Sequence, residues 1–170
     1  MIVALIVLVL AFLPMAFEAR LSARHERALR AAGAVEPAED VYRWMQIAYP
    51  AAFLTMAAEA ALRRADLNPI FAFGIAVFIA GKAIKYWAIA TLGSRWTFRV
   101  LVPPSSSLIS HGPYRYLRHP NYVGVIGELL GLAVAARATV SGSLSVVLFA
   151  ALIARRIHVE ERALDKASSH

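Results

Sequence analysis

Two parts of the sequence concentrate the side chains that could take part in chemistry. The first is the polar segment 93–121, which carries the aromatic, imidazole and guanidinium groups of Trp96, His111, Tyr114, Arg115, Tyr116, Arg118 and His119. The second is a charged cluster near the C-terminus, made of Arg155, Arg156, Glu160 and Glu161. Four prolines stiffen the first segment, because each restricts its own backbone and that of the residue before it. A long, stiff loop of this composition is more typical of a ligand pocket than of a tether.

Several kinds of site are excluded by what the sequence lacks. It has no cysteine, so disulfides and thiolate chemistry are excluded. It contains no glycine-rich dinucleotide or phosphate-binding motif and no His-Glu-x-x-His motif, which are the usual signatures of nucleotide and zinc sites. Its five histidines include no pair spaced four residues apart. We therefore expect no metal site.

The composition indicates an integral membrane protein. Hydrophobic residues make up 59% of the 170 residues and charged residues only 17%, and the mean hydropathy is +0.59. Too few polar side chains remain to cover the surface of a water-soluble domain of this size. The same hydrophobic content excludes intrinsic disorder. We expect one membrane domain that comprises residues 1–170.

Apolar runs predict five membrane-spanning helices and an all-α fold. They lie at residues 1–17, 44–62, 70–92, 122–136 and 140–157. A bilayer core requires roughly 20 apolar residues per helix, with about 17 to 25 tolerated. The first run lacks a basic segment before it, which favours an uncleaved span over a signal peptide. The last two runs are so close together that they predict a helical hairpin, and the charged segment 20–40 is expected to be a loop or a surface helix.

The basic residues predict the orientation. An N-terminus outside and a C-terminus in the cytoplasm would place 15 of the 18 Lys and Arg residues on the inner side, in agreement with the positive-inside rule. This orientation makes segment 93–121 a cytosolic loop. It also explains the net charge of +7 without nucleic acid as a partner.

A few polar residues fall inside the predicted spans, where they are costly and require a reason. For Lys82 and Lys85 we expect snorkelling toward the headgroups. Glu128 is too short to snorkel and is therefore a candidate functional residue, whereas Glu59 is expected at the membrane interface. Gly127 and Gly131 are spaced as in closely packed membrane helices.

Residues 108–124, with the run Gly-Pro-Tyr-x-x-x-Arg-His-Pro-x-Tyr, and the terminal residues 156–164 resemble the isoprenylcysteine carboxyl methyltransferase family of integral membrane enzymes. Within that family the chain is most similar to the bacterial branch that includes alkylpyrone O-methyltransferases. The motifs match over residues 92–164, whereas the first two spans match in hydropathy alone. The resemblance implies a methyltransferase core at residues 70–164 and a substrate tunnel formed by residues 1–62, in the inner membrane of a bacterium.

The resemblance also implies S-adenosylmethionine as the cofactor. The residues that match the cofactor site are Ser107, Leu108, Ile109, Tyr114, His119, Pro120, Asn121, Tyr122 and Glu160. Chemically, Arg118 could bind the cofactor carboxylate, Glu160 or Glu161 its ammonium group, and the tyrosine rings its sulfonium. One departure is that residues 99–106 lack the glutamine or histidine that family members often carry there, so the resemblance assigns no cofactor contact to that part of the loop.

The acceptor implied is an oxygen of a lipophilic molecule, such as an isoprenylcysteine, an alkylpyrone or an alkylresorcinol. Arg156 matches the substrate-facing arginine and is expected to orient an anionic acceptor. Glu128 or His119 is the candidate base if an enol or phenol must lose a proton. Two alternatives are a phospholipid or amine N-methyltransferase and a non-enzymatic membrane subunit on the same scaffold.

Overall fold

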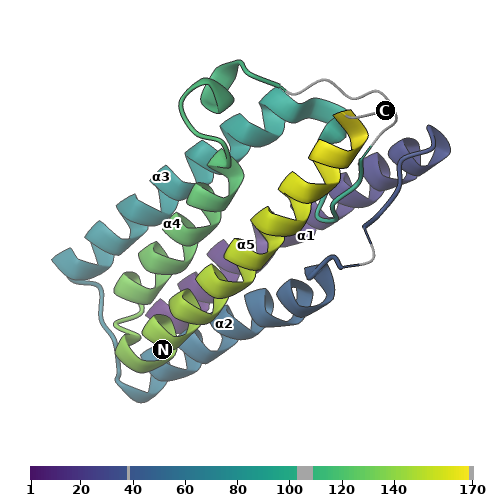
Figure 1. Ribbon diagram of the computed structural model, residues 1–170. Coiled ribbons are helices and arrows are strands. Elements are labelled where there is room, and N and C mark those ends of the chain that lie inside the picture. Colours follow the sequence, from purple (N-terminus) through teal and green to yellow (C-terminus); the bar gives the residue numbers. More distant parts are fainter. Residues whose placement is uncertain (38, 103–108, 169–170) are drawn as a thin grey trace.

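The computed structural model describes residues 1–37, 39–102 and 109–168, and for residues 163–168 it describes the backbone only. The helices are α1 (Ile2–Ala31), α2 (Tyr42–Leu62), α3 (Pro69–Leu92), α4 (Pro120–Ala135) and α5 (Thr139–Ser168). Two short 3₁₀ helices, η1 (Gly93–Arg95) and η2 (Gly112–Arg115), lie between α3 and α4. The predicted all-α fold is confirmed (Figure 1).

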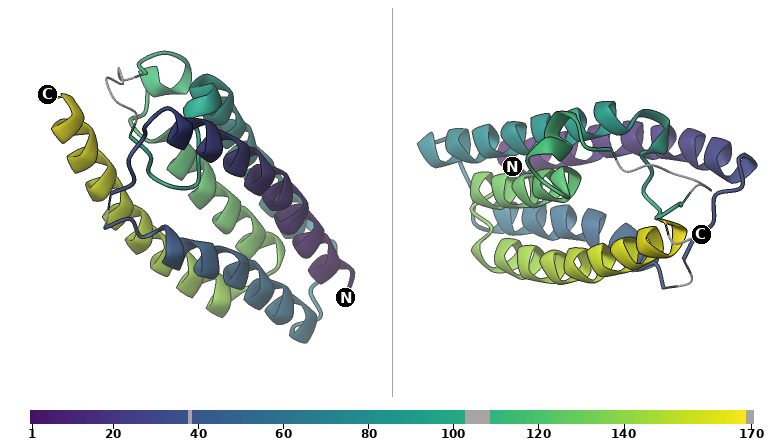
Figure 2. Two further views of the ribbon diagram at one scale, coloured as in Figure 1. Left: turned by 90° about the vertical axis from the view of Figure 1, so that its right-hand side faces the viewer. Right: turned by 45° about the horizontal axis from the view of Figure 1, so that its top comes forward.

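The helices form a bundle in which α3 packs along α4, α1 packs on α2, and α5 packs on both α2 and α4. The N-terminus and the α2–α3 and α4–α5 turns lie at one end of the bundle (Figure 1, Figure 2). The opposite end carries residues 32–37, 39–41, 93–102 and 109–119 together with the C-terminal part of α5. We call this second end the loop end.

Three helical segments are long and apolar enough to cross a membrane by length and composition. They are Ile2–Ala31, Pro69–Arg95 and Thr139–Arg162, with mean hydropathies of 2.6, 1.5 and 1.6. The helix Pro120–Ala135 is apolar but shorter. Large apolar side chains such as Leu5, Phe73 and Val147 are exposed on the outside of these helices, as expected where a protein faces lipid. The chain is therefore a membrane protein.

The first helix continues well beyond the predicted span. We expected the apolar run to end near residue 17, but α1 extends without interruption to Ala31. The added residues are mostly Ala, Leu, Arg and Glu, which favour helix. The helix stops just before Gly33, whose φ is 84°, a conformation that glycine adopts without strain. Segment 20–40 is therefore largely a charged extension of α1 at the loop end.

Glycines bring the backbones of α3 and α4 into direct contact. A Cβ atom on Gly131 would lie 2.4 Å from the backbone nitrogen of Phe78, and one on Gly81 would lie 2.8 Å from that of Glu128. A Cβ on Gly127 would come within 3.0 Å of the Cα of Gly81. The predicted close packing at Gly127 and Gly131 is confirmed, because only glycine allows backbones to approach this closely.

Glu59, which we expected at the membrane interface, binds the start of α5. Its carboxylate accepts hydrogen bonds from the backbone N–H of Val140 at 3.2 Å and of Ser141 at 2.7 Å. It also accepts one from the Ser141 hydroxyl at 2.6 Å. These are free donors of the first turn of α5, so a side chain of α2 caps α5.

Candidate functional site

A cavity of about 900 Å³ opens among the helices at the loop end. The predicted site residues that line it are Ile109, Tyr114, Arg118, His119, Asn121, Tyr122, Arg156, Glu160 and Glu161. Apolar side chains, including Met15, Met45 and Phe149, also line it. Phe149 lies about two helical turns from Arg156 toward the other end of the bundle. The cavity therefore joins a polar part at the loop end to a deeper apolar part.

Two predicted site residues do not line the cavity, and two others lie outside the described part of the chain. Pro120 is buried in the first turn of α4, where its fixed backbone favours the helix start, and it does not line the cavity. Glu128 is also buried, behind the cavity wall. Ser107 and Leu108 lie outside the residues that the structure describes.

The start of α4 and the end of α5 meet at the polar part of the cavity. The Tyr122 hydroxyl donates a hydrogen bond to Glu160 at 2.8 Å, and His119 Nε2 lies 3.4 Å from a carboxylate oxygen of Glu161. The rings of His119 and Tyr122 are stacked, with centroids 5.6 Å apart. Two segments that are far apart in the sequence thus present imidazole, phenol and carboxylate groups to one space.

Tyr114 extends this polar part from the 3₁₀ helix η2. It lines the cavity and is half-buried. Burial raises the pKa of the Tyr114 phenol far above its ordinary value, and the negative charge of Glu160 adds a smaller increase. Its hydroxyl therefore stays neutral, and the ring can serve as an apolar or hydrogen-bonding surface but not as a base.

Arg156 lines the cavity but is already bound to the protein on all sides. Its Nε donates to the Tyr122 hydroxyl at 2.8 Å, one Nη donates to Asp40 at 3.1 Å, and the other donates to the backbone carbonyl of Phe98. Its residue is 5% exposed. The guanidinium thus holds four segments of the chain together at the mouth of the site.

Asp40 is a site residue that sequence reasoning missed. Its side chain is 4% exposed and accepts hydrogen bonds from the backbone N–H groups of Tyr42 at 3.1 Å and Val100 at 3.0 Å. An aspartate two residues before a helix is a recognisable turn signal. Its ion pair with Arg156, however, joins residues 116 positions apart, and nothing in the local sequence indicates it.

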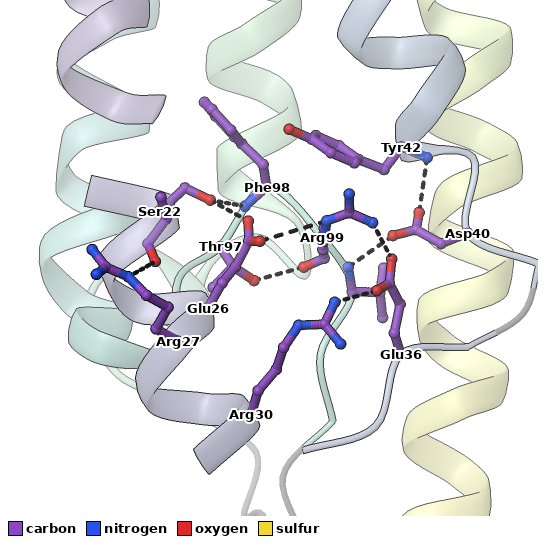
Figure 3. A network of polar contacts seen from close by, with 12 residues as sticks. Ser22, Glu26, Arg27, Arg30, Glu36, Asp40, Tyr42, Thr97, Phe98 and Arg99 are labelled. Atoms are coloured by element: carbon purple, nitrogen blue, oxygen red, sulfur yellow. Dashed lines mark hydrogen bonds and ion pairs between the residues drawn. The ribbon is translucent and has the colours of Figure 1, made fainter. Parts of the chain in front are cut away.

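The segment 96–102 is tied to α1 and to the loop before α2 by polar contacts (Figure 3). Phe98 donates its backbone N–H to Ser22 at 2.8 Å. Arg99 pairs with Glu36 at 2.6 Å and with Glu26 at 3.5 Å. A short bridge between Val35 and Val102 joins the same two loops. This strap, residues 96–102, forms one wall of the cavity.

Four charged side chains, from α1, α3 and α4, are buried together inside the bundle. Lys82 lies 2.8 Å from Glu18 and 2.9 Å from Glu128, and Lys85 lies 2.6 Å and 3.3 Å from the same two carboxylates. All four residues are at most 8% exposed. Our expectation that Lys82 and Lys85 snorkel to the headgroups is therefore wrong: buried carboxylates of α1 and α4 hold them inside the bundle.

Comparison with known proteins shows which family the chain is similar to. Residues 74–166 match the isoprenylcysteine carboxyl methyltransferase (ICMT) family. The chain is 31% identical to the uncharacterised protein YpbQ of Bacillus subtilis (strain 168), over 90% of this chain and 91% of that protein. It is 29% identical to an uncharacterised protein of Haemophilus influenzae, over 85% of each chain.

A named enzyme is also similar. Protein-S-isoprenylcysteine O-methyltransferase A of Arabidopsis thaliana is 32% identical over 96 residues, which are 55% of this chain and 49% of that protein. No solved structure matches the chain. The family match covers more than half of the chain and includes α4, α5 and the loop that joins α3 to α4. The chain therefore belongs to the ICMT family.

Proposed function

We propose that this protein is an S-adenosylmethionine-dependent O-methyltransferase that acts on a lipophilic acceptor inside the membrane. The observation that carries the proposal is one cavity of about 900 Å³ that reaches from His119 and Glu160 to apolar side chains of α1, α2 and α5. A methyltransferase for a lipid must bring a polar cofactor from water and an apolar acceptor from the bilayer to one point.

The polar part of the cavity fits the cofactor chemically. Glu161 is partly exposed and Arg118 is 90% exposed in its side chain, so both can exchange their mutual contact for the ammonium and carboxylate groups of an amino acid. The rings of Tyr114, Tyr122 and His119 offer faces to a nucleobase and to a sulfonium. When bound, S-adenosylmethionine supplies a methyl group on a positively charged sulfur.

The deeper part of the cavity fits an acceptor with a hydrocarbon chain. Met15, Met45, Pro50 and Phe149 line it, and unbranched methionines adapt readily to flexible chains. We propose an isoprenylcysteine, an alkylpyrone or an alkylresorcinol as the acceptor. Five cationic side chains line the cavity against two acidic ones, Glu160 and Glu161, which disfavours an amine acceptor; the cations are Lys85, Arg95, Arg99, Arg118 and Arg156.

The proposed enzyme has five membrane-spanning helices in a bacterial inner membrane, with the loop end in the cytoplasm. The positions of the termini at opposite ends of the bundle support an odd number of spans (Figure 1). The cofactor would then reach His119 and Glu160 directly from the cytosol, and the acceptor would never need to leave the bilayer.

The test is transfer of a labelled methyl group into an organic-soluble product by the purified chain. We expect His119→Ala and Glu160→Ala to abolish calorimetric binding of S-adenosylhomocysteine and, with it, turnover. His158→Ala is the matched control, because His158 is an exposed residue of the same part of α5 that does not line the cavity. Normal cofactor binding by both site variants would show that the site is assigned wrongly.

A separate variant tests Arg156. Arg156→Lys keeps the positive charge but loses the planar fork of donors. We expect it to bind S-adenosylhomocysteine and to lose turnover. A chain that binds no S-adenosylhomocysteine at all, even as the unmodified protein, would instead be a non-enzymatic membrane subunit on this scaffold.

A further inference from the structure

The buried charges of Glu18, Lys82, Lys85 and Glu128 require an explanation that the cofactor site does not supply. A buried ion pair is often no more stable than apolar side chains of the same volume, and inside a membrane ionisable residues are costly. Two carboxylates and two ammonium groups therefore add little to stability here. Such groups commonly mark a place where charge or a proton is handled.

One corner of this cluster reaches the cavity. Lys85 and Tyr49 both line it, whereas Glu18 and Glu128 do not. The Tyr49 hydroxyl donates a hydrogen bond of 2.6 Å to Oε2 of Glu128, and Lys85 Nζ lies 5.5 Å from the centroid of the Tyr49 ring. Tyr49 thus lines the cavity and also binds a buried carboxylate through its hydroxyl.

One oxygen of Glu128 lacks a hydrogen-bond donor. Within the described part of the chain its Oε1 has no hydrogen-bond donor, although Lys85 lies 3.3 Å away as an ion partner. A buried carboxylate oxygen without a donor is rare and asks for a reason. The carboxylate is therefore held at the site by charge, with one oxygen bound to Tyr49 and the other without a hydrogen bond.

We propose that Tyr49 is the catalytic residue that takes the proton of a hydroxyl acceptor and that it passes a proton on to Glu128. The inference rests on the proposed methyltransferase function and narrows its acceptor to an enol or a phenol. A carboxylate acceptor is already ionised near neutral pH and would need no such relay.

The step balances as follows. The acceptor oxygen forms its bond to the methyl carbon while the carbon–sulfur bond breaks and its electron pair stays on sulfur. The acceptor proton moves to the Tyr49 oxygen, and the proton of Tyr49 moves to Oε2 of Glu128. The positive charge that was on sulfur before the step is on the cluster after it, and the proton then leaves to water with the product.

The surroundings of Glu128 suit this transient charge. Among the described residues, Glu128 contacts Tyr49 of α2 and Lys82 and Lys85 of α3. Glu18 of α1 and Tyr86 of α3 lie against the same lysines. With both lysines protonated and both carboxylates ionised, the cluster is neutral at rest. Once Glu128 is protonated in the proposed step, Glu18 continues to balance part of the charge of Lys82 and Lys85.

The experiment compares two acceptors with the same tail, a long-chain alkylphenol and the corresponding alkylbenzoic acid, on the full chain in detergent. Tyr49→Phe removes only the hydroxyl and keeps the ring contacts with Phe53 and Phe149. Removing a general base lowers the rate about 100-fold or more, so we expect that loss on the phenol at pH 7. The benzoic acid should be methylated as well as by the unmodified protein.

The pH profile separates a missing base from a damaged cavity. A free phenol ionises near pH 10, so the rate of Tyr49→Phe on the phenol should rise about tenfold per pH unit between pH 7 and 9. Tyr116→Phe is the matched control, since Tyr116 is 72% exposed and does not line the cavity. We expect it to keep the activity of the unmodified protein within about twofold, as surface changes usually do.

Tyr49→Phe could lose activity for a reason other than the missing hydroxyl. A second variant and a measurement without a methyl donor address this case. Glu128→Gln keeps the volume of the side chain. It should show the same loss of the methylation rate on the phenol, which a higher pH restores, with unchanged binding of S-adenosylhomocysteine. Without any methyl donor, a nitro-substituted alkylphenol bound to the unmodified protein should ionise about one pH unit lower than when it is bound to Tyr49→Phe, which its absorbance reports.

The outcomes are distinct. Equal losses of Tyr49→Phe on both acceptors, or methylation of the benzoic acid alone by the unmodified protein, overturn the relay and leave the methyltransferase proposal standing. If the unmodified protein binds S-adenosylhomocysteine but methylates neither acceptor nor any lipid, the proposed function fails and the relay fails with it.

Discussion

The ion pair between Asp40 and Arg156 offers the sharpest test of how this site is held together. Asp40→Ala removes a carboxylate that binds Arg156 at 3.1 Å and the backbone N–H of Val100 at 3.0 Å. The two side chains are 4% and 6% exposed. Removing one partner of a buried pair costs about 3–5 kcal/mol, because the other charge is left without compensation.

That magnitude converts into a measurable shift. At roughly 2–4 °C per kcal/mol for a chain of this size, the apparent melting temperature of the purified protein should fall by roughly 6–20 °C. The adjacent acid provides the control. Glu39 also pairs with an arginine, Arg162 at 2.9 Å, but their side chains are 66% and 52% exposed. An exposed pair contributes about 0–1 kcal/mol, so Glu39→Ala should shift the melting temperature by a few degrees at most.

The assay is thermal unfolding in detergent, followed by tryptophan fluorescence because Trp96 lies in the strap that Asp40 holds. If the two alanine variants melt at the same temperature, the reasoning from burial is refuted. A double variant checks the cause. Arg156→Met in the Asp40→Ala background should recover part of the lost stability, since it removes the uncompensated charge.

Three further predictions follow from other contacts. Glu59→Ala should lower the free energy of unfolding by about 0.5–2 kcal/mol, the usual value of a helix cap, whereas Glu59→Gln should retain most of it in the same denaturation assay. Gly131→Ala should greatly reduce the yield of folded protein on size-exclusion chromatography, because its Cβ would lie 2.4 Å from a backbone atom of Phe78; Leu130→Ala, on an exposed position, should not. Burial alone would raise the pKa of Glu36, but hydrogen bonds from Arg99 and Arg30 lower it below 4.5. The resulting stability is therefore complete above pH 4.5 and is lost as the pH falls through the lowered value. In thermal scans below pH 4.5, the melting temperature of Glu36→Gln should fall less steeply with decreasing pH than that of the unmodified protein. An equal slope for the two proteins would contradict this.

The helices could be predicted well where the ends of an apolar run coincide with residues that start or stop a helix. The apolar run 70–92 became α3 (Pro69–Leu92), because Asn68 and Pro69 form a clear helix start in which the Asn68 side chain accepts from Phe71 at 2.9 Å. The length of α1 could not be predicted from hydropathy. Its apolar and charged parts are one helix, since nothing between them interrupts helical backbone.

The candidate site was predictable only in part, for a related reason. His119, Tyr122 and Glu160 lie in short motifs whose resemblance to a family can be recognised from the sequence. Their closeness in space depends on the hairpin of α4 and α5, which hydropathy also predicts. Glu18 and Asp40 carry no motif, and each finds its charged partners 64 or more residues away. Only the packing of α1 and the loop before α2 reveals what they do.

The glycine contact between α3 and α4 also limits how this protein can change shape. Where two backbones touch, no side chain lies between them that could rotate aside, so these two helices must move as one body. They provide Lys85, Tyr122 and Val125 to the cavity. A conformational change that admits or releases a bulky ligand must therefore occur in the opposite wall, where α1, α2 and α5 meet through adaptable side chains such as Met15 and Met45. Among relatives that bind ligands of different size, we accordingly expect the responsible sequence differences to lie in those three helices.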